Sequence, residues 1–458
     1  MRPTAIARRS AAFAAGITPM PIPRLYSQAG VASAAWRQAA IRGFGTTRTR
    51  PSAAIEGLGH DNDIPTARVQ PEAGPDVKVL VIGAGNINFG SDEGPWNHSQ
   101  RIEQKLGNRL KVVGLVDPAA SRAQAVLDAK KLTFAASAYA DTPIYRTVQE
   151  AISKLSGSPP DLVLLGSPPA FRGTTDPSKG LNTEIQLSEG FPKAALFVEK
   201  PVSTGSVGEA SKVAQFLEGK PNLVSVGYML RYSAAVQKMK QILKENNLEV
   251  MMTSARYVMA YEHSAKVAWW TKSIDCGPIV EQATHFCDLS RYFAGEVDLG
   301  TVMAHSVEWY EKPGQLTKIP FDEKNLVPED DRIPRFTSAT WKYKSGAIGH
   351  LEHGVALQGT EFSTEITVFA DGYQLKLIDP YNRPTLHVRR PGSDVEEVHN
   401  FNDDDPFLSE MSTFIDTAAK GTSDIPVLSS FADAVRTYEL TWAIRLASEK
   451  TRSPQSTK

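Results

Sequence analysis

Five short apolar runs recur in the first half of the chain, and segments with helical periodicity separate them. The runs are 77–82, 110–116, 161–165, 195–198 and 223–226. An uninterrupted apolar run is typical of a strand that is covered on both faces, and strands that alternate with helices form parallel sheets. The sequence therefore predicts an α/β domain built on a doubly wound parallel sheet.

After about residue 229 the pattern changes to longer strands in which apolar and polar residues alternate. Strands are expected at 338–343, 347–353, 364–370 and 373–378, with a two-residue turn at Asp371-Gly372, and helical periodicity returns over 407–447. We therefore expect a presequence and linker over 1–75, the α/β domain over 76–229, and an α+β domain over 230–450. The last of these should contain a large, open, mostly antiparallel sheet with one face solvated or covered by a partner.

The N-terminal segment is unusually rich in arginine. Residues 1–55 contain eight arginines, no lysine and no acidic residue, and the first acid is Glu56. Such a composition is typical of an organellar transit peptide, so we expect import into the mitochondrial matrix. The alternative is a disordered basic tail on a cytoplasmic enzyme.

The composition of the rest of the chain argues against several classes of protein. It is acidic and has no basic stripe interleaved with aromatic residues, so we expect no nucleic-acid partner. No stretch approaches the roughly 18 apolar residues that cross a bilayer, so we expect a soluble protein with no membrane partner. Cys276 and Cys287 are the only cysteines, which are too few for a disulfide framework.

A glycine turn, Gly83-Ala84-Gly85, directly follows the first apolar run. The first glycine permits a tight turn, and the second lets the backbone approach a pyrophosphate held at the next helix N-terminus. Asn88 replaces the usual third glycine, and residues 91–97 have the character of an insertion. We expect the turn, together with Asn86 and Ile87, to bind a dinucleotide; a simple turn is the alternative.

Asp117 ends the second apolar run. A carboxylate at this position can accept both ribose hydroxyls of NAD and would repel the 2′-phosphate of NADP. Arg122, five residues later, argues for NADP, so NAD is the preferred prediction and NADP stays open. Asp117 could also act as a helix N-cap before Pro118.

Glu199-Lys200-Pro201 closes the fourth apolar run, which places a lysine at the carboxyl end of a strand. Open α/β sheets bind their ligands at that edge. Further on, Glu281, His285 and Asp288 are spaced i, i+4 and i+7, which predicts that all three share one face of a helix. A histidine flanked by carboxylates can act as a general acid or base near neutral pH.

Oxidation of a secondary alcohol requires removal of its hydroxyl proton as the hydride leaves, and Lys200 and His285 are the candidates for this step. For His285 the alternative is a histidine buried in the core. A zinc site is not expected, because the spacing of Cys276, Glu281 and His285 matches no compact ligand motif. His350, Glu352 and His353 are interpreted as residues on a sheet surface.

Taken in order, these motifs resemble those of the Gfo/Idh/MocA oxidoreductases, over about residues 76–450. The residues that carry the resemblance are Gly83-Ala84-Gly85, Asp117, Ser167-Pro168-Pro169, Glu199-Lys200-Pro201 and Glu281 to Asp288. The resemblance implies an N-terminal Rossmann domain, followed by a domain whose open sheet walls the substrate site and often mediates homo-oligomerisation. It also implies a small-molecule substrate.

The resemblance also implies roles for single residues. Lys200 and Glu199 would lie near the nicotinamide, Pro201 would often be cis, and Ser167 and Pro168 would line the nicotinamide edge. The family's Asp-x-x-x-His motif maps onto Glu281 and His285, and the glutamate is a departure from it.

Arg231 follows the last strand of the first domain, in a segment that lies near the substrate site in the family. It could anchor a polar or anionic substrate, or it could pair with a nearby acid. Glu281 and Asp288 are further candidates for binding substrate.

The sequence thus predicts an NAD(P)-dependent oxidoreductase that transfers a hydride between nicotinamide and a secondary hydroxyl or carbonyl of a sugar, polyol or cyclic diol. One alternative is a non-catalytic NAD(P)-binding sensor or scaffold, since a Rossmann fold alone does not prove catalysis. The other is a redox-neutral enzyme with tightly bound NAD.

Overall fold

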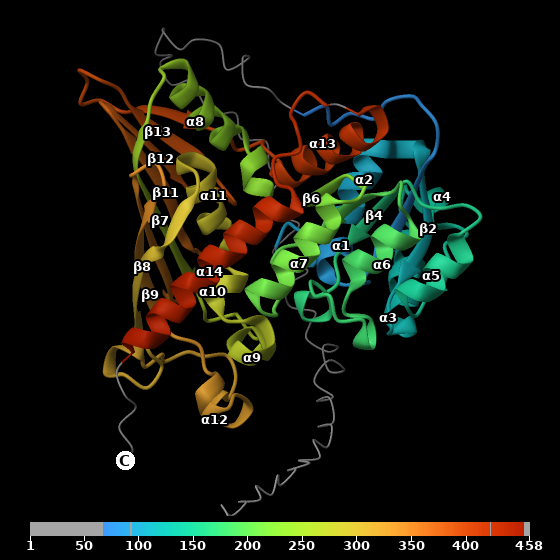
Figure 1. Cartoon of the computed structure of the whole chain (residues 1–458), viewed down its shortest axis with the longest axis horizontal. Coiled ribbons are helices and arrows are strands. Elements are labelled where there is room, and N and C mark those ends of the chain that lie inside the picture. Colours follow the sequence, from blue (N-terminus) through green and yellow to red (C-terminus); the bar gives the residue numbers. More distant parts are fainter. Residues whose placement is uncertain (1–66, 92–93, 422, 453–458) are drawn as a thin grey trace, which may run out of the picture. The chain divides into compact units, whose positions relative to one another are not determined.

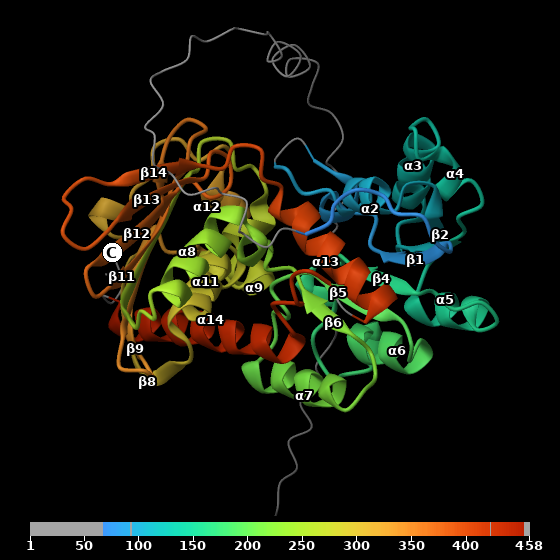
Figure 2. The same ribbon diagram turned by 90° about the horizontal axis from the view of Figure 1, so that it is seen from above.

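The computed structural model describes residues 67–91, 94–421 and 423–452. The predicted transit peptide lies outside the described residues. The described residues belong to one compact unit that contains two β-sheets, which Figure 1 and Figure 2 show from two directions.

The first sheet has six strands, and every neighbouring pair is parallel. Its strands are β1 Val77–Ile82, β2 Leu110–Val116, β3 Ile144–Tyr145, β4 Leu162–Leu165, β5 Ala195–Val198 and β6 Val224–Val226. The order β3-β2-β1-β4-β5-β6 places a topological switch point between β1 and β4, where doubly wound sheets bind ligands. The predicted parallel sheet is confirmed, although the two-residue β3 was not among the predicted strands.

Helices cover both faces of this sheet (Figure 1). They are α1 Asn86–Phe89, α2 His98–Leu106, α3 Ala120–Lys130, α4 Ala136–Tyr139, α5 Val148–Leu155, α6 Thr183–Gly190 and α7 Val207–Glu218. Along β1, alternate residues pack into the hydrophobic cores on the two faces of the sheet. Val79 and Val81 belong to one core, and Leu80 and Ile82 belong to the other. This double burial explains why the strands are uninterrupted apolar runs.

The second sheet has eight strands in the order β14-β13-β12-β11-β7-β10-β9-β8, and β7 and β10 form its only parallel pair. Its strands are β7 Val250–Ala260, β8 Val297–Val307, β9 Phe336–Tyr343, β10 Ile348–Leu357, β11 Ser363–Ala370, β12 Tyr373–Ile378, β13 Thr385–Arg389 and β14 Glu397–Asn400. The expected mostly antiparallel sheet is confirmed, with Asp371-Gly372 joining β11 to β12.

The helices of this part are α8 Ala234–Glu245, α9 Lys272–Asp275, α10 Pro278–Glu281, α11 Thr284–Ala294, α12 Glu323–Leu326, α13 Pro406–Lys420 and α14 Phe431–Thr451. Short 3-10 helices are η3 Gly107–Arg109, η4 Pro169–Phe171, η5 Ser178–Gly180, η6 Met229–Tyr232, η7 Val267–Trp270, η8 Lys312–Gly314 and η9 Glu329–Asp331. Figures 1 and 2 show α8, α11 and α14 on one face of the second sheet. We call the opposite face, which exposes Met303, Ile348, Phe369 and Val398, the outer face.

Two predicted helical segments are interrupted. The segment 407–447 forms α13 and α14, with a connection of ten residues between them. The predicted single helix through Glu281 and His285 is wrong, because α10 ends at Glu281 and α11 begins at Thr284. The amide of Ala283 donates to the carbonyl of Pro278 (2.9 Å), which closes α10 with a wider turn and changes the direction of the side chains that follow.

α13 returns to the first sheet rather than packing on the second. Met411, Phe414 and Ile415 belong to the core on the α2 side of the parallel sheet, and the ring of Phe414 lies 5.6 Å from that of Phe197 on β5. α14 then contributes Tyr438 to the other core of the first sheet and Ile444 to the core of the second. The C-terminal helices therefore join the two sheets.

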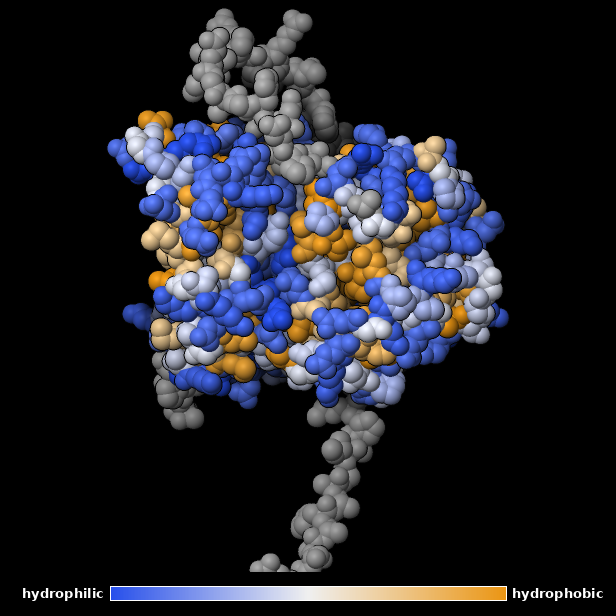
Figure 3. All heavy atoms as spheres, turned by 45° about the horizontal axis from the view of Figure 1, so that its top comes forward, coloured by the Kyte–Doolittle hydropathy of each residue, from blue (hydrophilic) through white to orange (hydrophobic). Residues whose placement is uncertain are grey.

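The described residues contain no helix that combines the length and the apolar composition needed to cross a membrane. On the face that Figure 3 shows, hydrophilic residues predominate and hydrophobic residues form separate patches.

Candidate functional site

The glycine turn lies at the switch point between β1 and β4. Gly83 has φ +94°, and a Cβ there would meet the carbonyl oxygen of Gly166, after β4, at 3.2 Å. At Gly85 a Cβ would meet nothing within 4 Å. The backbone of the turn is therefore open to a close ligand, as a dinucleotide pyrophosphate requires, and α1 begins at Asn86 directly behind it.

Asn88, which stands in place of the usual third glycine, holds the turn through its side chain. Its side chain is buried, and Nδ2 donates to the carbonyls of Ile82 (3.0 Å) and Gly83 (2.8 Å). The carbonyl of Ile82 also accepts the backbone amide of Gly166 (3.0 Å), so the side chain of Asn88 ties the glycine turn to the point where β1 and β4 end. Asn86 and Ile87 lie in the first turn of α1, beside Gly85.

Asp117 lies next to this turn at the end of β2. Its Oδ2 accepts a hydrogen bond from the amide of Ala84 (2.8 Å), and its Oδ1 accepts one from the amide of Ala119 (2.8 Å). Nη2 of Arg122 lies 2.9 Å from both oxygens. The structure therefore brings together the residues that predicted NAD and the one that argued for NADP.

The loops after β4 and β5 meet at the same edge of the sheet. Lys200-Pro201 is a cis peptide, as the resemblance implied. The buried Arg172 ties the two loops together, since it donates to the carbonyls of Ser167 (3.0 Å), Glu199 and Val202 (3.2 Å). Ser167-Pro168 and Glu199-Lys200 are thereby held side by side, although no sequence motif had pointed to Arg172.

Glu199 is fixed by a residue that the sequence analysis did not identify. Nε2 of His98, at the start of α2, lies 2.5 Å from Oε1 of Glu199, and the other carboxylate oxygen accepts the backbone amide of Lys200 (3.1 Å). Burial would raise the pKa of Glu199, but His98, Lys200 and Arg172 lower it overall. The ionised carboxylate therefore links α2 to the lysine.

Lys200 points to α10. Its Nζ donates to Oε1 (3.3 Å) and to the backbone oxygen (3.1 Å) of Glu281, while Nε1 of Trp269 donates to Oε2 of the same carboxylate (2.9 Å). Burial would raise the pKa of Glu281, but Lys200 and Lys266 lower it to about 2. An ionised Glu281 thus orients Lys200, and the structure brings these two motifs together although they lie 81 positions apart.

His285 begins α11 beside this pair. It is buried, its ring lies edge-on to Tyr228 (5.9 Å) and Tyr381 (6.2 Å), and its Nδ1 has no hydrogen-bond partner among the described residues. Burial and the charge of Lys200 move the pKa of His285 well below its usual value. The histidine is therefore neutral at pH 7, but no carboxylate of the described residues hydrogen-bonds it, contrary to the expectation from the sequence.

His353 on β10 faces the same region, which corrects its interpretation as a residue on the sheet surface. Its ring stacks on Tyr257 (5.6 Å), and its Nε2 donates to Oε1 of Gln282 (2.8 Å) in the break between α10 and α11. Tyr381 adds a buried hydroxyl without a partner among the described residues. These residues complete a site wall of aromatic rings and uncharged polar groups around Lys200, Glu281 and His285.

Arg231 and Asp288 pair with each other and not with Lys200 or Glu281. The guanidinium donates to both oxygens of Asp288 (2.7 and 2.6 Å) and also contacts Asp433 (2.6 Å). Burial would lower the pKa of Arg231, but the two carboxylates raise it overall. Because both side chains are buried and already paired, the structure contradicts their predicted role in substrate binding and supports the alternative of a structural ion pair.

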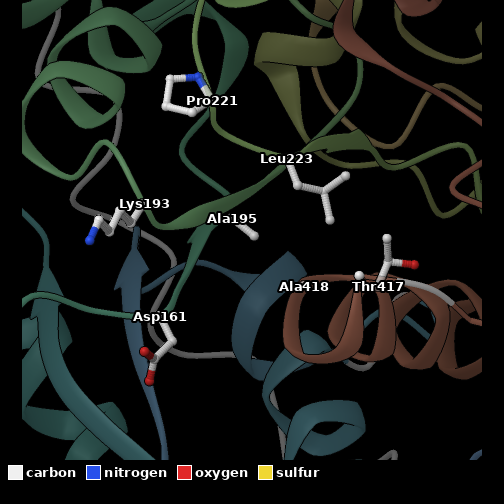
Figure 4. Close-up of a pocket in the computed structure, with 8 residues that line it drawn as sticks. Asp161, Lys193, Ala195, Pro221, Leu223, Thr417 and Ala418 are labelled. Carbon is white, nitrogen blue, oxygen red and sulfur yellow. The ribbon is translucent and has the colours of Figure 1, made fainter.

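The described residues contain no group of three histidine, cysteine, aspartate or glutamate side chains placed to hold a metal ion. A depression of about 310 Å³ lies at the opposite, amino edge of the parallel sheet (Figure 4). It is bounded by residues such as Asp161, Lys193 and Leu223, which lead into β4, β5 and β6, and by Thr417 from α13, so it is remote from the carboxyl ends of β4 and β5, which Ser167 and Lys200 follow.

Comparisons with known proteins agree with this arrangement. Residues 77–228 match the family model of oxidoreductases with an NAD-binding Rossmann fold, the Gfo/Idh/MocA model, and residues 231–373 match an oxidoreductase C-terminal domain. The uncharacterized protein UNK4.17 of Schizosaccharomyces pombe is 46% identical over 385 residues, which is 83% of this chain and 93% of that protein.

Solved structures share the fold at low sequence identity. The WlbA dehydrogenase of Chromobacterium violaceum, in complex with NADH and UDP-GlcNAcA, aligns with a TM-score of 0.60 at 16% identity, over 84% of this chain and 97% of that one. The 3-ketoreductase KijD10 of Actinomadura kijaniata, in complex with NADP, aligns with a TM-score of 0.59 at 13% identity, over 81% and 98%.

Proposed function

This chain belongs to the Gfo/Idh/MocA family of NAD(P)-dependent oxidoreductases, and we propose that it transfers a hydride between the nicotinamide and a secondary hydroxyl or carbonyl group of a sugar, polyol or cyclic diol. The observation that carries the proposal is the meeting of Lys200, Glu281 and His285 from three different elements. They lie at the edge of the parallel sheet that also carries the open glycine turn.

The wall of the site supports a ring-shaped, hydroxylated substrate. Tyr381, which is half-buried beside His285, provides aromatic surface that can pack against the apolar face of a ring, and the buried rings of Trp269 and Tyr257 support this wall from the core. The side-chain amide of Gln282, which the buried His353 holds in place, provides an uncharged hydrogen-bonding group that suits hydroxyls. Similar folds bind UDP-GlcNAcA in the WlbA dehydrogenase and belong to a 3-ketoreductase in KijD10, which is consistent with a sugar.

Lys200, Glu281 and His285 have different roles in the proposed reaction. Lys200, held by Glu281, donates a hydrogen bond to the reacting oxygen of the substrate and stabilises the negative charge that develops on it. His285 is neutral and accepts the hydroxyl proton in the direction of oxidation, or returns it in the direction of reduction. Bound nicotinamide supplies the carbon that accepts or donates the hydride.

Substitution of the two groups tests the proposal. Lys200→Ala and His285→Ala should each lower turnover by about 10²-fold to 10⁴-fold, because each removes a proton-handling or charge-stabilising group. Both variants should still bind the dinucleotide in a fluorescence titration. The measurement is the change in NAD(P)H absorbance with a panel of sugars, polyols and cyclic diols.

Lys193→Ala and His305→Ala are matched controls, because they remove an exposed lysine at the amino edge of the parallel sheet and an exposed histidine of β8. Full activity in both Lys200→Ala and His285→Ala would refute the assignment of the site. A cofactor that stays bound through gel filtration, with no net change in NAD(P)H during turnover, would instead indicate redox-neutral chemistry.

We also propose that the chain forms homo-oligomers through the outer face of its second sheet. The support is that the described helices cover only the other face, whereas the apolar side chains of Phe369, Met252 and Ile348 lie next to one another on the outer face. Exposed apolar side chains that lie together can mark a protein interface.

Import into mitochondria is a separate proposal that rests on composition. The eight arginines and the lack of acids in residues 1–55 support it. A reporter protein fused to residues 1–66 should colocalise with a mitochondrial marker, whereas diffuse cytoplasmic signal would contradict the proposal.

A further inference from the structure

The carboxylate of Glu281, which holds Lys200, is itself contacted from two sides. Nζ of Lys200 donates to Oε1 (3.3 Å), and Nε1 of Trp269 donates to Oε2 (2.9 Å). Glutamate has one more side-chain torsion than the aspartate that the family motif carries at this position. A hydrogen bond to one oxygen leaves the longer arm free to turn, whereas hydrogen bonds to both oxygens fix the carboxylate.

The indole of Trp269 is held in place by the protein core. Trp269 lies in η7, its side chain is buried, and its ring lies edge-on to that of Trp270 at 5.6 Å. An indole N–H is a donor only, and it usually finds an acceptor when it is buried. Here the acceptor is a carboxylate at the site, so a rigid ring presents a fixed donor to Glu281.

The neighbouring tryptophan has no such connection to the site. Nε1 of Trp270 donates to the backbone carbonyl of Ser264 (2.8 Å), and its ring is fully buried in the same core. Both tryptophans therefore satisfy their N–H groups, but only the N–H of Trp269 does so on a residue that contacts Lys200.

The position of the Glu281 carboxylate determines where Lys200 points. An ammonium group has three N–H donors. Among the described residues, Nζ of Lys200 uses one donor on Oε1 of Glu281 and another on the backbone oxygen of Glu281 (3.1 Å). Once these two are fixed, the tetrahedral geometry of the nitrogen fixes the direction of the third, which is available to the reacting oxygen of the substrate.

We infer that Trp269 is a positioning residue for the proposed reaction, and that it acts through Glu281 to fix the direction in which Lys200 donates to the substrate oxygen. The inference rests on the proposed function and adds to it a residue whose N–H acts on the carboxylate rather than on the reacting atoms. Loss of that N–H should therefore lower turnover and leave binding of the dinucleotide unchanged.

Trp269→Phe tests the inference, because it removes the N–H and keeps an aromatic ring. Hydrogen bonds to a charged group correspond to about tenfold to a hundredfold. We expect kcat to fall by about tenfold, the lower end of this range, because Lys200 keeps the backbone oxygen of Glu281. kcat/KM should fall equally, since the lost contact acts in the transition state. The assay uses the best substrate of the sugar, polyol and diol panel.

Trp270→Phe is the matched control, because it removes the N–H of an adjacent buried tryptophan that points away from the site. It should keep the turnover of the wild type. A fluorescence titration with NADH should give the same dissociation constant for the wild type and for both variants.

Combination with Glu281→Gln separates positioning from a structural effect. In a Glu281→Gln background, Trp269→Phe should change kcat by less than about threefold, because the ionised acceptor is already absent. A purely structural role of Trp269 would instead lower kcat by the same factor in both backgrounds, and this result would overturn the inference.

Chemical labelling of Lys200 gives a second readout that needs no substrate. Its side chain is 17% exposed, so acetic anhydride can reach it, and mass spectrometry can compare its labelling with that of the exposed Lys193. Acylation requires the uncharged amine, and a fixed carboxylate holds the ammonium form. Lys200 should therefore be labelled about threefold to tenfold faster in Trp269→Phe than in the wild type or in Trp270→Phe.

Unchanged turnover or unchanged labelling in Trp269→Phe would overturn the inference and leave the proposed function intact. If Trp269→Phe does not fold, Glu281→Asp tests the same contact. Its shorter arm should not reach Lys200 and Trp269 together, so turnover should fall and labelling of Lys200 should quicken; wild-type values of both would overturn the inference. A wild-type chain that turns over no member of the panel would instead refute the proposed function.

Discussion

At the scale of single residues, folding lowers the pKa of His353 strongly. Burial lowers the pKa of His353 to about 3, and nearby Glu281 raises it only in part. The unfolded chain takes up a proton near pH 6.5, whereas the folded chain takes it up only near pH 3. Between these values the unfolded state binds more protons, so the free energy of unfolding falls as the pH falls.

His353→Gln should remove this part of the acid sensitivity. Between pH 7 and pH 5.5 the wild type should lose about 1 kcal/mol more unfolding free energy than His353→Gln, because glutamine does not titrate. Urea unfolding at the two pH values measures the difference. His263→Gln, at an exposed position in the turn after β7, is the control and should behave like the wild type; equal losses in all three proteins would contradict the prediction.

Site residues that belong to a local sequence motif could be predicted from the sequence. Lys200 follows a strand, Gly83 and Gly85 follow another, and each motif has a structural reason that is readable in its own neighbourhood. His98, Arg172 and His353 could not be found in this way. His98 meets Glu199 across 101 positions, and His353 meets Gln282 across 71, so packing between distant elements defines their roles.

At the scale of elements, the break between α10 and α11 decides where the site residues point. Periodicity across residues 281–288 predicts one helical face, and it carries no sign of the wide turn at Ala283. Because of that turn Glu281 faces Lys200, whereas Asp288 faces Arg231 on the opposite side. Uninterrupted apolar runs, by contrast, predicted five of the six parallel strands, since burial on both faces leaves a direct signature.

Gly277 fixes the start of α10, and its substitution should affect both stability and activity. It has φ +80° and ψ 169°, a conformation that is essentially restricted to glycine. Gly277→Ala should lower the unfolding free energy by about 1–3 kcal/mol and lower turnover, because α10 carries Glu281. Chemical denaturation and steady-state kinetics measure the two effects.

Gly157→Ala is the control for this experiment. Gly157 lies in a turn of the first domain with a negative φ, and a Cβ there would meet nothing within 4 Å. This variant should keep both stability and turnover. A Gly277→Ala protein that loses stability but keeps full turnover would show that α10 positions Glu281 independently of its first residue.

At the scale of the whole molecule, we expect the outer face of the second sheet to determine the state of association. Phe369, Met252 and Ile348 lie in one row, because the strand register pairs Met252 with both neighbours. Ile348→Glu should dissociate the oligomer, since an unpaired charge is costly to bury in an apolar interface. Analytical ultracentrifugation measures the change in mass.

Leu132→Glu provides the control for association, because Leu132 is an exposed apolar residue of the first domain. It should leave the mass unchanged. A wild-type chain that sediments as a monomer would contradict the proposal for this face.

The sequence predicted both sheets and their order along the chain, because strand periodicity differs between a sheet covered on both faces and one covered on a single face. It did not predict that the C-terminal helices return to the parallel sheet. The apolar stripe of α13 indicates a buried face, but it does not indicate which core receives that face.

The return of α13 has a consequence for how the protein is made. A ribosome releases the six parallel strands long before it reaches Met411, Phe414 and Ile415, which belong to the core beneath them. Domains generally fold in the order of synthesis, with the N-terminal one first. The part of the parallel-sheet core that α13 covers therefore stays exposed until about 180 further residues have been synthesised. We therefore expect chaperones to engage this chain during translation, and a fragment that stops at residue 228 to aggregate.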